Sequence, residues 1–380
     1  MKATLRRSAR NGSNVRVALP AHLAARQTGL REVLGEKRGV DALLVTSPLD
    51  IRYLTGFCGE AAWMLVTPRD LVVISDRRFE EELHDSFGYV KTVIRKKSHA
   101  EELGKLVRAK RIATLAVQAE HFTLDQRKTV VKHSAGVKLR PVSGWLLELR
   151  SIKDAVEVDE LAKAVAIQEQ ALEQTIGQLR AGMTEREITG ILESHMWRLG
   201  ADGPGFPTIV AAGEHSSLPH HGPGDRRLAE HEPLLVDYGA LVGGYHSDMT
   251  RVVFLGQPSA RFRKIYEIVR EAHAAAVAAV APGRPLAEVD AAARRVIVKA
   301  GYGKQFSHGI GHGIGLQIHE EPFMRAKALG ELRPGQVVTI EPGIYLPGVG
   351  GVRLEDDVLV TDSGQRRLCA LPTDLAWAVV

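Results

Sequence analysis

Apolar and polar positions between residues 29 and 150 alternate in two distinct patterns. Residues 31–38 have apolar side chains at helical spacing, and Pro68-Arg69-Asp70 separates two apolar runs in a way that predicts a hairpin. The apolar runs that predict strands cover residues 41–45, 63–66, 71–74 and 112–117. Such alternation is typical of an α/β domain. The stretch contains no phosphate-binding loop and no dinucleotide-binding fingerprint.

A second domain is predicted to follow residues 146–154, where the strand-like runs end. Residues 156–180 have apolar positions at helical spacing and predict a long helix at the start of this domain. We therefore expect one domain over residues 29–150 and another over residues 151–380.

The second domain contains a faint internal repeat. Residues 182–200 resemble residues 283–301 at a constant offset of 101 positions. Each copy begins a helix, and in the first copy Thr184 and Glu187 have the spacing of a capping box. Two related halves that face each other would place a functional site at their junction.

Length and cysteine content agree with a two-domain globular protein. The chain has 380 residues, which is too long for one typical core. Its two cysteines, Cys58 and Cys369, lie in different predicted domains, so no disulfide framework is indicated and both are expected to be buried thiols. No run of about 18 apolar residues occurs, so no membrane span and no membrane partner are expected.

The basic charge is concentrated at the N-terminus. Residues 1–31 contain seven Lys or Arg and no acidic residue, so the net charge of +5 leaves −2 for the rest of the chain. A mildly acidic body has no electrostatic basis for binding nucleic acid. Residues 1–28 are expected to form a basic, disordered tail. The tail lacks a clear amphipathic repeat, which favours a cytoplasmic location, with organelle import through the tail as the alternative.

Two acidic residues lie in a predicted hairpin between residues 234 and 251. Each arm is apolar, and Gly243-Gly244 stand at the bend. If these glycines form the turn, Asp248 lies opposite Gly239, which shares a face with Asp237 because side chains alternate along a strand. The two carboxylates are then diagonal neighbours on one face.

A second apolar pair of arms, residues 337–345 and 350–360, contains Glu341 and Glu355 in otherwise buried-looking sequence. Burying an unpaired carboxylate costs several kcal/mol, so acids on apolar strands need a cation. The four carboxylates of the two hairpins carry −4, which two divalent ions cancel and one does not. The charge count therefore favours a dinuclear metal site.

His312 lies in a segment with four glycines, residues 306–320, between the two acid-bearing hairpins. Glycine lets backbone approach a ligand closely, where a Cβ would collide. An oxygen-rich ligand set with one imidazole favours Mn²⁺, Co²⁺, Fe²⁺ or Zn²⁺ over Mg²⁺ alone.

These segments resemble metallopeptidase family M24, which includes methionine aminopeptidase, prolidase and aminopeptidase P. The resemblance extends from about residue 29 to the C-terminus, and the N-terminal part resembles the creatinase-type domain of the last two. It implies an α+β protein, with a creatinase-like α/β domain before a pseudo-twofold "pita-bread" domain. The family's metal ligands fall, in order, on Asp237, Asp248, His312, Glu341 and Glu355.

The resemblance also implies roles around the metals. His220 follows a Ser-x-Leu-Pro run and, with His319, is expected to orient substrate and pass protons; His221 stands where many members have glycine, and we favour His220 as the inward-facing ring. Glu341 is expected to act as both ligand and base. The expected supporting residues are His308, Arg353 and Thr250. Tyr345 is expected to be a core residue.

The function implied is hydrolysis of the bond between an N-terminal residue and proline, by a hydroxide that bridges two divalent ions, most favourably Mn²⁺. The expected partner is a peptide with proline at its second position, and such proteins are often homodimers. Creatinase-like chemistry without metal and a non-catalytic module are both disfavoured because the ligand series is complete. A metal-dependent hydrolase or lyase of a small non-peptide substrate remains the alternative.

Overall fold

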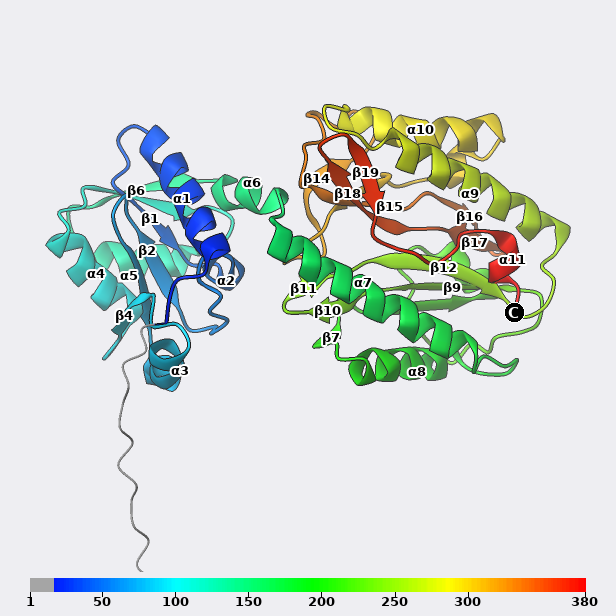
Figure 1. Cartoon of the computed structure of the whole chain (residues 1–380), viewed down its shortest axis with the longest axis horizontal. Coiled ribbons are helices and arrows are strands. Elements are labelled where there is room, and N and C mark those ends of the chain that lie inside the picture. The colour runs from blue at the N-terminus through cyan, green and yellow to red at the C-terminus, as the bar shows by residue number, and fades with distance from the viewer. Residues whose placement is uncertain (1–16) are drawn as a thin grey trace, which may run out of the picture. The chain divides into compact units, whose positions relative to one another are not determined.

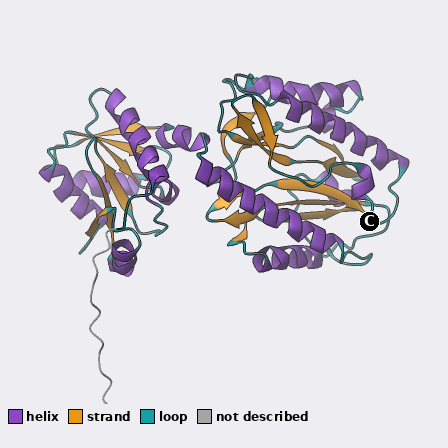
Figure 2. Ribbon diagram, in the orientation of Figure 1, coloured by secondary structure: helices purple, strands orange, loops and turns teal. Residues whose placement is uncertain are grey.

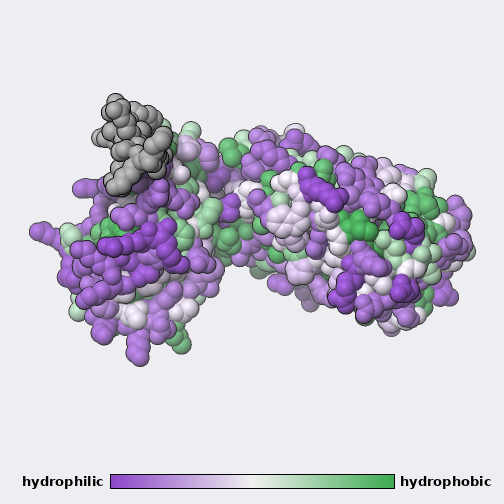
Figure 3. Space-filling model, turned by 90° about the horizontal axis from the view of Figure 1, so that it is seen from below, coloured by the Kyte–Doolittle hydropathy of each residue, from purple (hydrophilic) through white to green (hydrophobic). Residues whose placement is uncertain are grey.

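The computed structural model describes residues 17–380. The chain forms two compact units, Met1–Leu146 and Leu147–Val380, and each is described separately. Figure 3 shows hydrophilic side chains over much of the visible surface, with hydrophobic ones in small groups between them. Among the described residues, no helix is long and apolar enough to span a membrane.

The N-terminal unit is built on one six-stranded sheet with the strand order β4-β3-β2-β1-β5-β6, and helices lie around it (Figure 2). Strands β1, β2 and β3 are antiparallel neighbours, whereas β4, β5 and β6 each join in parallel. The β2–β3 hairpin confirms the turn predicted around Pro68. The elements are α1 (Ala21–Glu36), β1 (Ala42–Val45), α2 (Pro48–Thr55), β2 (Trp63–Val66), β3 (Leu71–Ser75), η1 (Arg77–Phe79), α3 (Glu80–Asp85), β4 (Lys91–Ile94), α4 (His99–Ala109), β5 (Thr114–Gln118), α5 (Leu124–His133) and β6 (Lys138–Val142).

The expectation of a disordered tail over residues 1–28 is wrong for its last part. Helix α1 begins at Ala21, ten residues before the predicted helix. Arg26 is buried and donates a hydrogen bond to the Tyr53 carbonyl at 3.0 Å, and Gln27 donates to the Leu54 carbonyl at 3.0 Å. These polar side chains therefore belong to the folded unit. The rest of the tail, residues 1–16, lies outside the described part of the chain.

The cysteine expectation holds for only one residue. Cys369 is buried, but Cys58 is exposed. The preceding residue, Phe57, points into the core with no exposed surface. Its neighbour Cys58 therefore faces solvent.

In the C-terminal unit, strands lie between two pairs of helices, α7/α8 and α9/α10 (Figure 1). One apolar core packs α7 and α8 against the strands, and a second packs α9 and α10 against them. The helices are α6 (Trp145–Ser151), which crosses the unit boundary, α7 (Ala155–Ile176), α8 (Glu185–Arg198), η2 (Gly213–Ser217), α9 (Ala260–Ala279), α10 (Leu286–Lys299), η3 (Gly303–Gln305) and α11 (Leu375–Ala378).

The strands of this unit form four small sheets, ordered β12-β9-β8, β11-β10-β7, β14-β13-β15-β18-β19 and β16-β17. Their bounds are β7 (Gly203–Pro204), β8 (Ile209–Ala212), β9 (Pro233–Tyr238), β10 (Ala240–Val242), β11 (Tyr245–His246), β12 (Met249–Phe254), β13 (Gly311–Gly313), β14 (Glu320–Met324), β15 (Val337–Ile340), β16 (Gly343–Leu346), β17 (Gly350–Arg353), β18 (Asp356–Thr361) and β19 (Gly364–Arg367).

The predicted repeat corresponds to two equivalent helices. Helices α8 and α10 begin and end at the 101-residue offset found in the sequence. The turns before them match as well, because the Gly182 amide donates to the Leu228 carbonyl and the Gly283 amide to the Leu332 carbonyl, both at 2.8 Å. The predicted capping box of Thr184 is present only in the first copy. The two halves of this unit are therefore related in structure.

Candidate metal centre

The first acid-bearing hairpin has the predicted register. Val242 pairs with Tyr245 around the two-glycine turn, and Asp237 pairs with Thr250 further along. Continuing the register places Gly239 opposite Asp248. A Cβ at Gly239 would lie 1.7 Å from the Ser247 carbonyl oxygen, so only glycine fits where the hairpin bends from β9 into β10.

The second pair of arms differs from the prediction, because each arm is broken in the middle. Strand β15 pairs with β18, and β16 pairs with β17 in a separate sheet. The break lies at Glu341 and Glu355, whose amides donate to the Ile310 and Thr250 carbonyls instead of to each other's strand. Opening the ladder there frees both acidic side chains to face the same space.

His312 lies on the short strand β13, between β14 and β15. The glycines on either side of His312 were expected to let the backbone approach a ligand. In the structure they instead let neighbouring strands pack closely against β13. A Cβ at Gly311 would lie 1.9 Å from the Thr339 carbonyl oxygen, and one at Gly313 would lie 2.2 Å from that of Glu321. The glycines therefore let three strands approach closely and present the imidazole between them.

The predicted ligands converge on one cavity of about 820 Å³. Ligand atoms of Asp248, His312 and Glu355 all lie within 4.8 Å of one another. His312 Nε2 is 3.7 Å from Asp248 Oδ2 and 3.8 Å from Glu341 Oε1. The other ring nitrogen, Nδ1, contacts the Gly313 carbonyl at 3.0 Å, so it carries the proton and Nε2 presents a lone pair to the acids.

Asp237 joins the group through Arg353, which pairs directly with Asp237 Oδ2. Thr250 Oγ1 donates to Glu355 Oε2 at 2.6 Å and accepts from Arg353 Nε at 2.9 Å. Tyr345 was expected only to fill the core, but its hydroxyl accepts from Arg353 Nη1 at 2.9 Å. Sequence reasoning missed this role because a tyrosine on an apolar strand gives no sign of where its hydroxyl lies.

Electrostatics favour a cation among these acids. Burial, followed by repulsion from neighbouring carboxylates, raises the pKa of Asp248 and of Glu355 well above their ordinary values. Burial also raises the pKa of Glu341 to about 8. Asp237 Oδ1 and Asp248 Oδ1 are buried without a hydrogen-bond partner. Unpaired buried carboxylate oxygens beside an imidazole lone pair are the donor set that a divalent transition metal needs.

Arg353 changes the charge count made from sequence. The four carboxylates and this buried guanidinium carry a net −3 when all are ionised. One divalent ion would leave −1 and two would leave +1. The charges of these protein groups therefore do not distinguish one ion from two until the charge of a bound nucleophile is added.

Four more histidines line the cavity, and they differ in what they contact. The ring of His319 lies edge-on to that of His312, with centroids 4.4 Å apart. His308 Nε2 is 2.9 Å from the Tyr345 hydroxyl, and its Nδ1 is 3.8 Å from Glu341 Oε2. His220 is exposed on the cavity wall, whereas His221, which also lines the cavity, contacts Glu185 at 2.8 Å.

A buried ion group anchors the segment that carries His319. Glu320 pairs with Arg150 and, at 3.3 Å, with Lys153, and all three side chains are at most 3% exposed. Glu320 Oε1 also accepts from the Gln317 amide at 3.0 Å, which closes the turn around His319. No sequence pattern pointed to this group, because its cations lie about 170 residues from Glu320 in the chain.

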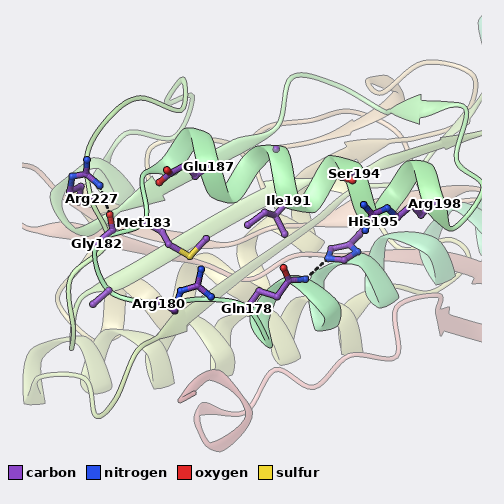
Figure 4. A pocket seen from close by; sticks show the side chains of 12 residues that line it. Gln178, Arg180, Gly182, Met183, Glu187, Ile191, Ser194, His195, Arg198 and Arg227 are labelled. Atoms are coloured by element: carbon purple, nitrogen blue, oxygen red, sulfur yellow. Dashed lines mark hydrogen bonds between the residues drawn. The ribbon is translucent and has the colours of Figure 1, made fainter.

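A separate hollow of about 740 Å³ lies along helix α8. Figure 4 shows its wall, where Gln178 is hydrogen bonded to His195 at 2.8 Å. None of the predicted site residues lines it. The chemistry predicted from sequence is therefore gathered in the other cavity.

Known proteins resemble both units. Residues 159–362 match metallopeptidase family M24, and residues 26–152 match the creatinase/prolidase N-terminal domain. An uncharacterized peptidase of Bacillus subtilis is 34% identical over 346 residues, which are 91% of this chain and 98% of the relative. An Xaa-Pro dipeptidase structure from Bacillus anthracis has a TM-score of 0.90 at 34% identity, over 93% of this chain and 99% of its own. An X-Pro aminopeptidase structure from Thermotoga maritima has a TM-score of 0.86 at 32% identity, over 91% of this chain and 98% of its own.

Proposed function

Because the chain belongs to metallopeptidase family M24, we propose that it is an exopeptidase that cleaves the bond between an N-terminal residue and proline. The observation that supports this most is the grouping of Asp237, Asp248, His312, Glu341 and Glu355 in one cavity with His220 and His319. The similar structures from Bacillus anthracis and Thermotoga maritima, both Xaa-Pro peptidases, point to the same substrate class.

Two divalent ions, which we propose to be Mn²⁺, would be held by the five ligands and would supply the ionisation of a water molecule at neutral pH. Two ions with the four carboxylates and Arg353 sum to +1, a charge that one hydroxide nucleophile neutralises. This balance supports a dinuclear centre over a mononuclear one.

The protein's own groups would then handle protons and orientation. Glu341 faces the cavity, where we propose that its carboxylate, besides holding metal, accepts and returns the proton of the nucleophilic water. His220 and His319 lie on the cavity wall, where we propose that they orient the substrate carbonyl and protonate the leaving nitrogen. Arg353 and Thr250 hold Asp237 and Glu355 in place.

The cavity also suits a proline-containing substrate. A peptide bond to proline has no N–H, so the substrate cannot be bound as an added β-strand and needs a pocket for the ring. Apolar side chains line part of the wall, including Phe206, Ile318 and Phe323, beside the polar ligand group. A cavity of about 820 Å³ has the size of ordinary small-ligand sites and accommodates a short peptide.

The test is a substrate panel assayed on metal-stripped protein reconstituted with Mn²⁺, Co²⁺ or Zn²⁺. We expect cleavage of Xaa-Pro dipeptides, of longer peptides that begin Xaa-Pro, or of both, and the pattern separates a dipeptidase from an aminopeptidase. Cleavage of Met-Ala peptides alone would contradict the proline assignment. Turnover of none of these peptides by metal-loaded protein would leave the small non-peptide hydrolase or lyase as the better assignment.

A further inference from the structure

A second group of metal-ligating side chains lies outside the centre described above. Glu185 is the first residue of α8, His215 lies in η2, and His221 follows Pro219 in the next loop. His215 Nδ1 is 2.9 Å from Glu185 Oε1, and His221 Nε2 is 2.8 Å from Glu185 Oε2. One ligand atom from each lies within 4.8 Å of the others. The group shares no residue with the five ligands of the predicted dinuclear centre.

Among the described residues, Glu185 is a buried carboxylate that no Lys or Arg side chain contacts directly, although Arg226 lies near enough to act on it electrostatically. The Glu185 side chain has no exposed surface. The Ala212 and Gly224 amides each donate to it at 2.9 Å and fix both carboxylate oxygens. Both oxygens of this buried carboxylate are therefore held in fixed positions beside the two imidazoles, which is the arrangement of a preformed ligand.

We propose that Glu185, His215 and His221 bind a single Zn²⁺ ion, in addition to the metals of the dinuclear centre. Two imidazoles and one carboxylate are a known donor set for zinc, with water in the fourth position. The exposed fractions of the two imidazoles, 32% for His215 and 12% for His221, leave the group open to solvent on that side.

The distances suit this ion after a small adjustment. Tetrahedral zinc with bonds of about 2.0–2.1 Å separates its ligand atoms by about 3.4 Å. His215 Nδ1 lies 2.9 Å from Glu185 Oε1, and His221 Nε2 lies 2.8 Å from Glu185 Oε2. Whichever oxygen binds the ion, the nitrogen beside it needs to move away by only about half an ångström. The ring centroids of His215 and His221 are 4.4 Å apart, so both rings already lie on the same side of the carboxylate.

Each ring can also take the tautomer that binding requires. Zinc would replace the proton on His215 Nδ1 and on His221 Nε2, so the proton must move to the other ring nitrogen. Among the described residues, neither His215 Nε2 nor His221 Nδ1 has a hydrogen-bond partner or is enclosed without one. Both nitrogens can therefore carry the proton toward solvent.

The experiment counts zinc. Wild-type protein and a His215→Asn variant are equilibrated with Zn²⁺, passed through a desalting column and analysed by inductively coupled plasma mass spectrometry. Asparagine can still donate a hydrogen bond to Glu185 but offers zinc no imidazole. We expect His215→Asn to hold about one equivalent of zinc less than wild type. Equal zinc content in the two proteins would overturn the proposal.

Two further variants separate binding from a structural role. His215→Cys provides a thiolate, which binds zinc but cannot replace the imidazole hydrogen bond. This variant should therefore keep the equivalent of zinc that His215→Asn is expected to lose. If the cluster is only a hydrogen-bonded support, His215→Cys will instead hold no more zinc than His215→Asn. His84→Asn is the matched control, because His84 contacts Asp85 at 2.7 Å but is exposed, and it should leave the zinc content unchanged.

Because the result is a difference between variants, it does not depend on how many ions the dinuclear centre holds. Substituting Asp248→Asn in both wild type and His215→Asn keeps the two questions apart. Even when the dinuclear centre loses metal, the protein with His215 should still hold about one equivalent of zinc more than the protein with asparagine at that position. If Asp248→Asn abolished that equivalent, the zinc would belong to the dinuclear centre and the proposal would fail.

Discussion

Replacing Glu320 with glutamine tests whether the buried ion group stabilises the C-terminal unit. The substitution keeps the shape of the side chain but removes the negative charge between Arg150 and Lys153, whose side chains are 2% and 1% exposed. Removing one partner of a buried ion pair costs about 3–5 kcal/mol because the opposite charges lose a counterion in a poorly solvated interior. For a unit of this size, 1 kcal/mol corresponds to about 2–4 °C in Tm, so the expected decrease is about 6–20 °C.

The loss of stability in Glu320→Gln should depend on pH. Burial raises the pKa of Glu320, but Lys153 and Arg150 outweigh it and leave the pKa below its ordinary value. A lowered folded-state pKa stabilises the protein above the unfolded pKa, and this contribution is lost as pH falls through the folded value. The gap in Tm between wild type and Glu320→Gln should therefore be full at neutral pH and shrink in acid.

The assay is calorimetric unfolding of the metal-loaded protein at several pH values, with kcat/KM on an Xaa-Pro dipeptide measured alongside. Glu321→Gln is the matched control, because Glu321 is adjacent and exposed and should change stability by no more than about 0.5 kcal/mol. Activity should fall in Glu320→Gln because the neutral amide pairs less strongly with Arg150 and Lys153, so the turn around His319 is held less firmly. If both variants unfold at the wild-type temperature, the ion group does not stabilise the unit and the reasoning fails.

Three further predictions concern the metal centre. Glu341→Gln should lower kcat by about 100-fold or more while the circular dichroism spectrum stays unchanged, and undiminished turnover would refute its role as base. In metal-free protein the raised pKa of Glu341 means that urea-measured stability should fall as pH rises from 4.5 to about 8, and Mn²⁺ should reverse this loss; a flat profile would contradict the burial argument. Tyr345→Phe removes a hydroxyl that accepts from the buried Arg353 and should cost about 1.5–3 kcal/mol in denaturant melts, whereas an unchanged midpoint would show that the bond contributes nothing.

Local patterns in the sequence predicted the elements that carry the site. The two-glycine turn determined the register between Asp237 and Asp248, and the 101-residue repeat predicted that each copy begins a helix, as α8 and α10 do. Alternation and turn chemistry act over a few residues, so they can be recognised without the fold. The break of the second hairpin at Glu341 and Glu355 was missed, because its cause is amide bonding to Ile310 and Thr250 on other strands.

The contacts that tune the site could not be predicted in the same way. Arg353 was expected to brace the acids, and it does pair with Asp237, but its effect on the charge balance of the site was not anticipated. The glycines around His312 were assigned to the ligand, whereas they accommodate neighbouring strands. Glu185 meets His221 across 36 positions. Each of these depends on which distant segments the fold brings together.

The most direct test of the central claim is X-ray diffraction from crystals of Mn²⁺-loaded protein, with anomalous data collected near the manganese edge. Two anomalous peaks are expected in the cavity, one of them beside His312 Nε2. Each should lie within bonding distance of carboxylate oxygens of Asp237, Asp248, Glu341 or Glu355. Fully loaded crystals without anomalous density among these side chains would contradict the central claim.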